Sequence, residues 1–328
     1  MGAYLARRLL YMVLTVFLVS IVSFLIIQLP PGNYLNTVAA QMTADGQVDE
    51  QALAVLEQRY GLDQPLPVQY LTWMGGMLQG DFGYSFQWNM PVADLIGSRV
   101  LLSLGISLCA LLVTWLIAFP IGIYSAVRRY SVGDYVFTMI GFIGLAVPEF
   151  LLGLVLAYVA FRFLGQDVGG LVSPEYENAA WNLGKVLDVI GHLWMPVLVI
   201  GAAGTAALIR VLRSTILDEM GKPYVEAARA KGLSERRLLL KYPVRLSLGP
   251  FLSTVGWVLP ALVSGEVVVS IVFNLPTTGP LLLQALKAQD MYLAGSFILM
   301  LSLLTVIGTL ISDLLLARSD PRIRYSYR

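Results

Sequence analysis

Few side chains in this 328-residue chain have the chemistry that catalysis requires. His192 is the only histidine and Cys109 the only cysteine, which rules out a two-histidine zinc site and an internal disulfide. Two carboxylates, Glu149 and Glu266, fall inside long apolar segments, where an ionisable group is costly and by default marks a transport pathway. No Gly-x-Ser-x-Gly turn occurs, so an intramembrane hydrolase ranks last among the function classes.

The composition is that of a membrane protein. Apolar residues make up 57% of the chain and charged residues only 13%, whereas about a quarter of the residues of a soluble domain are charged. The mean hydropathy is +0.73. Six apolar segments are long enough to cross about 30 Å of hydrocarbon. We predict an all-α polytopic fold with spans at residues 9–29, 101–124, 136–163, 193–209, 251–272 and 294–316.

The distribution of cations predicts the orientation. All but five of the 22 lysines and arginines fall in the N-terminal tip, the 127–135 turn, the 210–250 connection and the C-terminal tail. Because cytoplasmic loops collect such residues, we predict that both termini are cytoplasmic. Membrane insertion alone accounts for this positive face, so no nucleic-acid partner is predicted. The five exceptions are Arg59, Arg99, Arg162, Lys185 and Lys287.

The segment after the first span, residues 30–99, is too long for a simple connection and predicts a small external module. Residues 48–59 have helical spacing. Further on, Tyr70, Trp73, Met74 and Met77 predict an amphipathic helix on the membrane surface, and a turn follows at residues 80–83.

The 210–250 connection has the pattern of a docking element. Pro223 suits the first turn of a helix, Gly232 can adopt the left-handed conformation that ends one, and Ser234 can cap the next. The first helix is rich in alanine, and small residues let another protein's backbone approach closely. An ordinary basic loop is the alternative that charge alone leaves open.

The order Glu226-Ala227-Ala228, three residues and then Gly232, before the last two spans, resembles the EAA loop of ABC importer permeases. Five further segments are similar to the dipeptide, oligopeptide and nickel branch of this family. They are the opening segment YLARRLLYMVLTVFLVSIVSFLIIQLPPG, the external segment GLDQPLPVQYLTWMGGMLQGDFGYSF, the turn FPIGIYSAVRRYSVGDY, the segment HLWMP and the ending DPRIRY. The chain departs from the family's usual sequence at Tyr242-Pro243 and in the segment LPTTGPLLLQALKAQD. These departures leave the substrate subclass open, and not the assignment as a transporter.

The resemblance implies a type I importer permease fold in a bacterial inner membrane. Its parts would be residues 1–29, an external module at 30–99, a five-helix core at 100–316 with the EAA loop at about 210–250, and a tail at 317–328. The coupling residues it implies are Glu226, Ala227, Ala228, Ala230, Lys231 and Gly232.

Its implied partners are a second, homologous permease, two cytosolic ATPases and an external solute-binding protein that would dock near Asp81, Phe82 and Tyr84. The chain has no Gly-x-x-x-x-Gly-Lys-Ser/Thr loop, so we expect ATP and magnesium on the partner subunits and no cofactor or metal on this one. It is therefore expected to be a transport subunit and not an enzyme.

The pathway is predicted at two helix breaks. Pro148 interrupts the third span beside Glu149, and Gly265 stands beside Glu266 in the fifth, so both helices can bend along a cavity. Pairing of either carboxylate with a neighbouring helix is the alternative. The expected solute is a peptide, a nickel chelate or an oligosaccharide. A proton-coupled secondary transporter that uses the two glutamates is the competing function.

Overall fold

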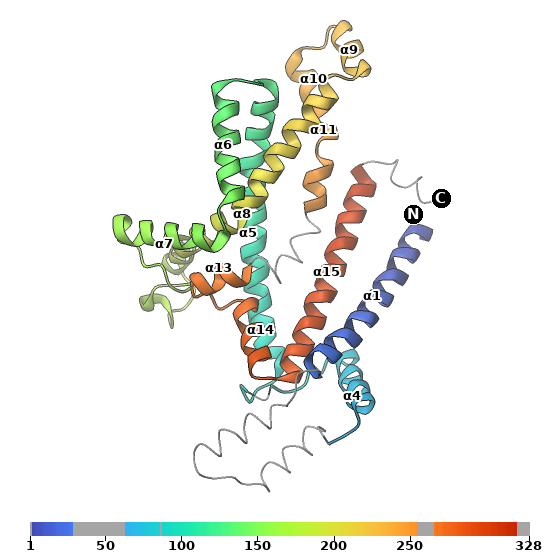
Figure 1. The fold of residues 1–328 in the computed structure, drawn as a ribbon, viewed down its shortest axis with the longest axis vertical. Helices are drawn as coiled ribbons and strands as arrows, with labels where there is room; N and C mark the ends of the chain where they lie inside the picture. The colour runs from blue at the N-terminus through green and yellow to red at the C-terminus, as the bar shows by residue number, and fades with distance from the viewer. Residues whose placement is uncertain (1, 29–62, 86, 255–265, 320–328) are drawn as a thin grey trace. The chain divides into compact units, whose positions relative to one another are not determined.

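A computed structural model describes residues 2–28, 63–85, 87–254 and 266–319. Its regular elements are helical, apart from one isolated bridge between Tyr84 and Pro91, so the predicted all-α class is confirmed for the described residues (Figure 1). The elements are α1 (Gly2–Gln28), α4 (Leu66–Leu78), α5 (Val92–Val127), α6 (Val132–Ala146), α7 (Glu149–Leu164), the 3-10 turn η1 (Pro174–Tyr176), α8 (Leu183–Met220), α9 (Pro223–Ala230), α10 (Glu235–Lys241), α11 (Pro243–Leu246), α13 (Glu266–Val272), α14 (Thr278–Lys287) and α15 (Met291–Ser319).

Four described helices are long and apolar enough to cross a membrane: α1, α5, α8 and α15. Many of their large apolar side chains are exposed, among them Leu10, Leu101 and Leu116. Lipid can cover such side chains, whereas water cannot do so favourably. Cys109 of α5 is also exposed.

The third predicted span is not one continuous helix. It is divided into α6 and α7, whose axes differ by 107°. The break lies at Val147 and Pro148, where we expected a bend, because a residue before proline is forced into extended backbone (Val147 has ψ 125°). The size of this bend was not predicted.

Two other predicted spans differ from the structure or fall partly outside it. The fourth, at 193–209, is the middle of the much longer α8. The fifth, at 251–272, includes residues 255–265, which lie outside the described residues, as do the predicted helix at 48–59 and residues 30–62 and 86 of the external module.

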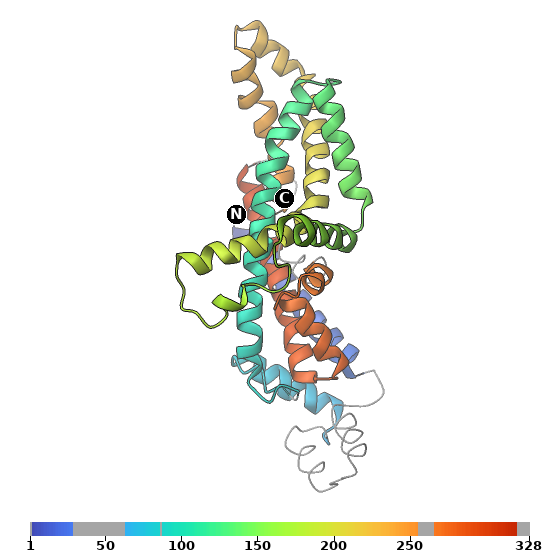
Figure 2. The same ribbon diagram turned by 90° about the vertical axis from the view of Figure 1, so that its left-hand side faces the viewer.

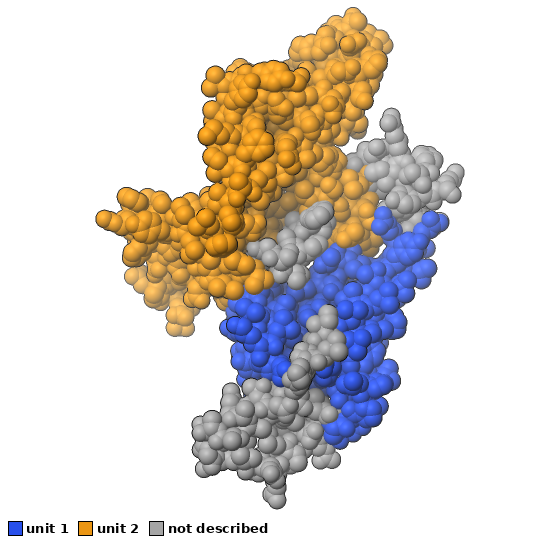
Figure 3. Space-filling view, viewed as in Figure 1, with its two compact units in different colours: residues 1–102, 277–306 blue, residues 103–276, 307–328 orange. Residues whose placement is uncertain are grey.

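The chain forms two compact units, which Figure 3 colours separately. Unit 1 comprises residues 1–102 and 277–306. Its apolar cluster joins Phe24 of α1, Trp73 of α4 and Met291 and Leu299 of α15. The predicted helix around Trp73 therefore exists, and protein covers one of its faces.

Unit 2 comprises residues 103–276 and 307–328 and packs largely around α8 (Figure 2). Glycines let α5 and α8 approach closely. A Cβ on Gly122 would lie 2.8 Å from Leu212 Cδ2, and one on Gly201 would lie 2.8 Å from Thr114 Oγ1. These small residues bring the backbones together, as is usual at helix interfaces within membranes.

Candidate functional site

The predicted docking element is a helix, a glycine turn and a second helix. Pro223 occupies the first turn of α9, and Gly232 ends the segment with φ +85°. Ser234 stands in the capping position of α10, although its side chain makes no capping hydrogen bond. The helix, hinge and helix expected from the sequence are therefore present, at the end of unit 2 where α8 ends (Figure 1).

The element is held together by its own small core. Val225 and Ala228 of α9 are buried against Leu238 of α10, with Leu233 and Tyr242 partly buried around them. This divides the predicted coupling residues into two groups. Ala228 supports the fold of the element, whereas the others are exposed: Glu226, Ala227, Ala230, Lys231 and Gly232.

Two polar contacts stabilise this element, one between α9 and α10 and one between the start of α9 and the end of α8. Arg229 donates from Nε to Glu235 Oε1 at 2.6 Å, and this pairing lowers the pKa of the Glu235 carboxyl. Both side chains are exposed, so the pair contributes little to stability. The Tyr224 hydroxyl donates to the Glu219 carboxylate at the end of α8, and partial burial together with this contact raises the pKa of Tyr224 to about 12.

The predicted pathway residues are only partly described. Pro148 precedes α7 at the break, and Glu149 is half-buried in the first turn of α7. Gly265 lies outside the described residues, and Glu266 begins α13. Helices α7 and α13 do pack together, since a Cβ on Gly153 would lie 3.5 Å from Val272 Cγ1.

A cavity of about 520 Å³ in unit 2 was not expected from the sequence. It lies between α5, α8 and residues 250–254, and small or hydroxyl-bearing side chains line much of it. Ser107 Oγ lines it and is buried without a hydrogen-bond partner among the described residues. Uncharged hydroxyls in an apolar wall suit contact with an uncharged polar group.

The predicted external docking residues make contacts within unit 1. Asp81 Oδ1 accepts the Gly83 N–H at 2.9 Å, the Phe82 carbonyl accepts the Ser296 hydroxyl at 3.0 Å, and the Tyr84 hydroxyl donates to the Asn89 carbonyl at 2.5 Å. Asp81 and Tyr84 remain exposed. These contacts fix the shape of the loop and leave two of the three side chains accessible.

The loop is anchored by Asp290, which sequence reasoning missed. This fully buried carboxylate accepts the Ser85 hydroxyl at 2.5 Å and the Gln87 N–H at 3.2 Å. Its other oxygen accepts the Leu293 N–H at 3.1 Å and so caps α15. An aspartate directly before an apolar helix was the available signal.

We expect Gly83→Ala to destabilise unit 1 more than Gly80→Ala. Both glycines have φ near +80°, so both variants carry the same backbone strain. A Cβ on Gly83, however, would lie 2.5 Å from Tyr292 Cδ1, whereas Gly80 has no atom within 4 Å. The difference in unfolding free energy should be about 1 to 3 kcal/mol. Equal losses in the two variants, measured by reversible unfolding in mixed micelles, would contradict this packing.

Only one ring nitrogen of His192 has a hydrogen-bond partner among the described residues. Its Nδ1 lies 2.8 Å from the Asp188 carbonyl, while its Nε2 is buried without a partner among the described residues. The Asp188 carboxylate in turn accepts the Ser173 hydroxyl at 2.6 Å. These contacts join the loop before α8 to the start of that helix. No cluster of three or more potential metal ligands occurs in the described ranges.

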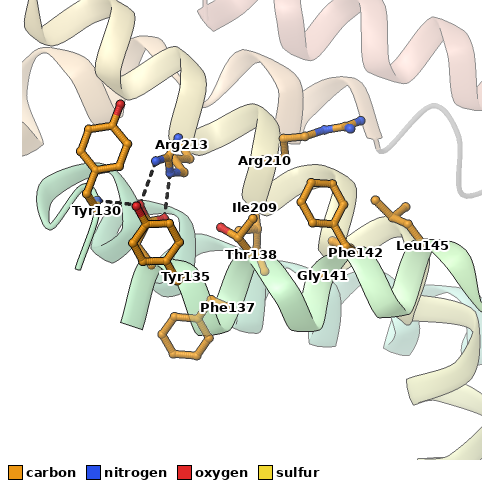
Figure 4. Close-up of a pocket in the computed structure, with 12 residues that line it drawn as sticks. Tyr130, Tyr135, Phe137, Thr138, Gly141, Phe142, Leu145, Ile209, Arg210 and Arg213 are labelled. Carbon is orange, nitrogen blue, oxygen red and sulfur yellow. Dashed lines mark hydrogen bonds and ion pairs between the residues drawn. The ribbon is translucent and has the colours of Figure 1, made fainter. Parts of the chain in front are cut away.

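A second missed feature joins α6 to α8. Arg213 donates from Nε to Asp134 Oδ1 at 2.9 Å and from Nη2 to Oδ2 at 2.8 Å, and the Tyr130 N–H adds a third bond at 2.9 Å (Figure 4). Such a bidentate pair fixes the two helices in one register.

Comparison with known proteins identifies the class. Residues 118–325 match the family described as binding-protein-dependent transport system inner membrane component, and residues 1–108 match the N-terminal region of the same class of membrane component. The chain belongs to this family. It is therefore a multi-pass inner-membrane permease subunit and not an enzyme.

Individual relatives cover nearly the whole chain. It is 36% identical over 326 residues to the oligopeptide transport system permease protein AppB of Bacillus subtilis, covering 99% of this chain and 100% of that one. It is 33% identical over 307 residues to a putative peptide permease protein of Brucella ovis, with 93% of each chain covered. The glutathione transport system permease protein GsiC of Salmonella choleraesuis is 33% identical, with 98% of this chain and 99% of that one covered.

Proposed function

We propose that the chain forms half of the translocation path of an ATP-driven importer for oligopeptides or related peptides such as glutathione. The names of its relatives support this solute class. They give no support to the oligosaccharide that we also expected. Membership in a binding-protein-dependent family also disfavours the proton-coupled alternative.

The proposed assembly has a second, homologous permease, two cytosolic subunits that hold ATP and magnesium, and an external solute-binding protein. In the topology we propose, six helices cross the membrane with both termini in the cytoplasm, and the external module contacts the binding protein through Asp81, Phe82 and Tyr84. Pro148, Glu149, Gly265 and Glu266 are proposed to border the solute path.

One observation carries the proposed ATPase coupling: α9 has an exposed face of small residues backed by its own core. Val225 and Ala228 are buried against α10, so Ala227 and Ala230 are free to contact another protein. The connection from α8 to α9 is only two residues long. A subunit that moves α9 would therefore also move α8.

Ala227→Leu tests this proposal. We expect the amount of ATPase subunit that copurifies with the permease to fall about fivefold, and the rate of peptide uptake to fall by the same factor. The reason is that a larger side chain would separate two closely packed surfaces. The matched control is Arg236→Leu, which places the same side chain on the exposed surface of α10. Loss of the ATPase with the control, or its full retention with Ala227→Leu, would contradict docking through α9.

A further inference from the structure

A groove between α6 and α8 in unit 2 has an apolar floor and a polar rim (Figure 4). Its volume is about 300 Å³. The floor is formed by residues along both helices, which are Thr138, Gly141, Phe142, Leu145, Ala206 and Ile209. Such a lining suits a hydrocarbon chain.

Two arginines of α8 line the groove, and only one of them is neutralised. Arg213 is held by Asp134, whose oxygens also accept the Tyr130 N–H. Arg210, one helical turn away, makes no hydrogen bond or ion pair with any described residue, and Figure 4 draws no contact to it. Because Asp134 is already engaged and Arg210 is exposed, the guanidinium of Arg210 is available to an anion from outside the chain.

The rim carries further groups that suit a lipid headgroup. Tyr130 and Tyr135 line the groove and are exposed. The guanidinium of Arg129 lies 4.4 Å from the centre of the Tyr130 ring. Tyrosine and arginine are favoured at the headgroup level of a membrane, where a ring lies in apolar surroundings and a charge meets phosphate.

We infer that this groove binds one anionic phospholipid, with an acyl chain against Phe142 and Ile209 and the headgroup phosphate at Arg210. The groove lies beside the turn before α6, which contains Arg128 and Arg129. In the topology proposed above this turn contacts the cytoplasmic leaflet, which carries anionic lipids. The complementary charge and the apolar floor favour a phospholipid over a free anion, which would leave the floor uncovered.

Native mass spectrometry of the purified transporter complex tests the inference, with dioleoyl phosphatidylglycerol and dioleoyl phosphatidylcholine as probes. We expect one phosphatidylglycerol to be retained per chain in preference to phosphatidylcholine. Arg210→Gln should weaken its binding about tenfold, the size expected for loss of a charge-assisted contact. The control Arg237→Gln, which removes an exposed arginine of α10, should leave binding unchanged.

A second pair of variants tests the groove with Arg210 intact. Thr138→Trp fills the groove and should also weaken binding about tenfold, whereas Ile140→Trp, at an exposed position of α6 outside the lining, should not. Equal retention of the two lipids would overturn the inference. So would unchanged binding in Arg210→Gln, the result expected if an acidic residue of the second permease occupies this position.

Discussion

Arg213→Gln is expected to lower the unfolding free energy of unit 2 by about 3 kcal/mol, because it leaves a carboxylate buried without its counter-ion. Only 3% of the Asp134 side chain is exposed, so water cannot replace the two lost hydrogen bonds. The Tyr130 N–H would remain as a donor and would soften the loss only in part. Reversible unfolding in mixed micelles measures the change.

The reverse variant should cost less. Asp134→Asn leaves Arg213 unpaired, but 25% of the arginine side chain is exposed and its long stem lets the charge reach water. The double variant should recover part of the loss seen in Arg213→Gln, because the uncompensated carboxylate is gone. Strictly additive losses would show that the pair is not coupled.

Gly232→Val is expected to lower peptide uptake by the reconstituted transporter at least tenfold while ATP hydrolysis continues. At φ +85° a residue with a Cβ is strained by about 1 to 2 kcal/mol, and a β-branched residue by more. A Cβ here meets no atom within 4 Å, so the strain comes from the backbone and not from a clash. Relief of that strain would reorient α9 relative to α10.

Gly232→Asn is the matched control, because asparagine tolerates the left-handed conformation better than other side chains. The Gly232→Asn variant should keep most of the wild-type rate of peptide uptake. Uptake and ATPase activity at the wild-type level in Gly232→Val would show that the turn plays no part in coupling, and equal losses in both variants would point to the added bulk itself.

Local chemistry made much of the fold predictable. The apolar runs place α1, α5, α8 and α15, since any segment that crosses hydrocarbon must satisfy its own backbone hydrogen bonds. The turn around α9 follows equally directly from Pro223 and Gly232, whose backbone preferences act within one or two residues.

The contacts that could not be predicted from the sequence join residues that are far apart along the chain. Asp134 and Arg213 are 79 positions apart, and Ser85 and Asp290 are 205 apart. Each is an ordinary polar residue in its own segment, and only packing makes it a buried partner. The division of Glu226, Ala227 and Ala228 into exposed and buried positions likewise depends on Leu238 of the next helix.

The length of α8 has a mechanical consequence for the proposed transporter. Its 38 residues follow about 57 Å of helix axis, nearly twice the thickness of the hydrocarbon core, and Figure 2 shows this axis turning between an N-terminal arm and a C-terminal arm. Pro196 is the one proline inside the helix and removes a hydrogen bond, so the helix can bend there. A displacement where α8 meets α9 would therefore reach the N-terminal arm as a change in the angle between the two arms.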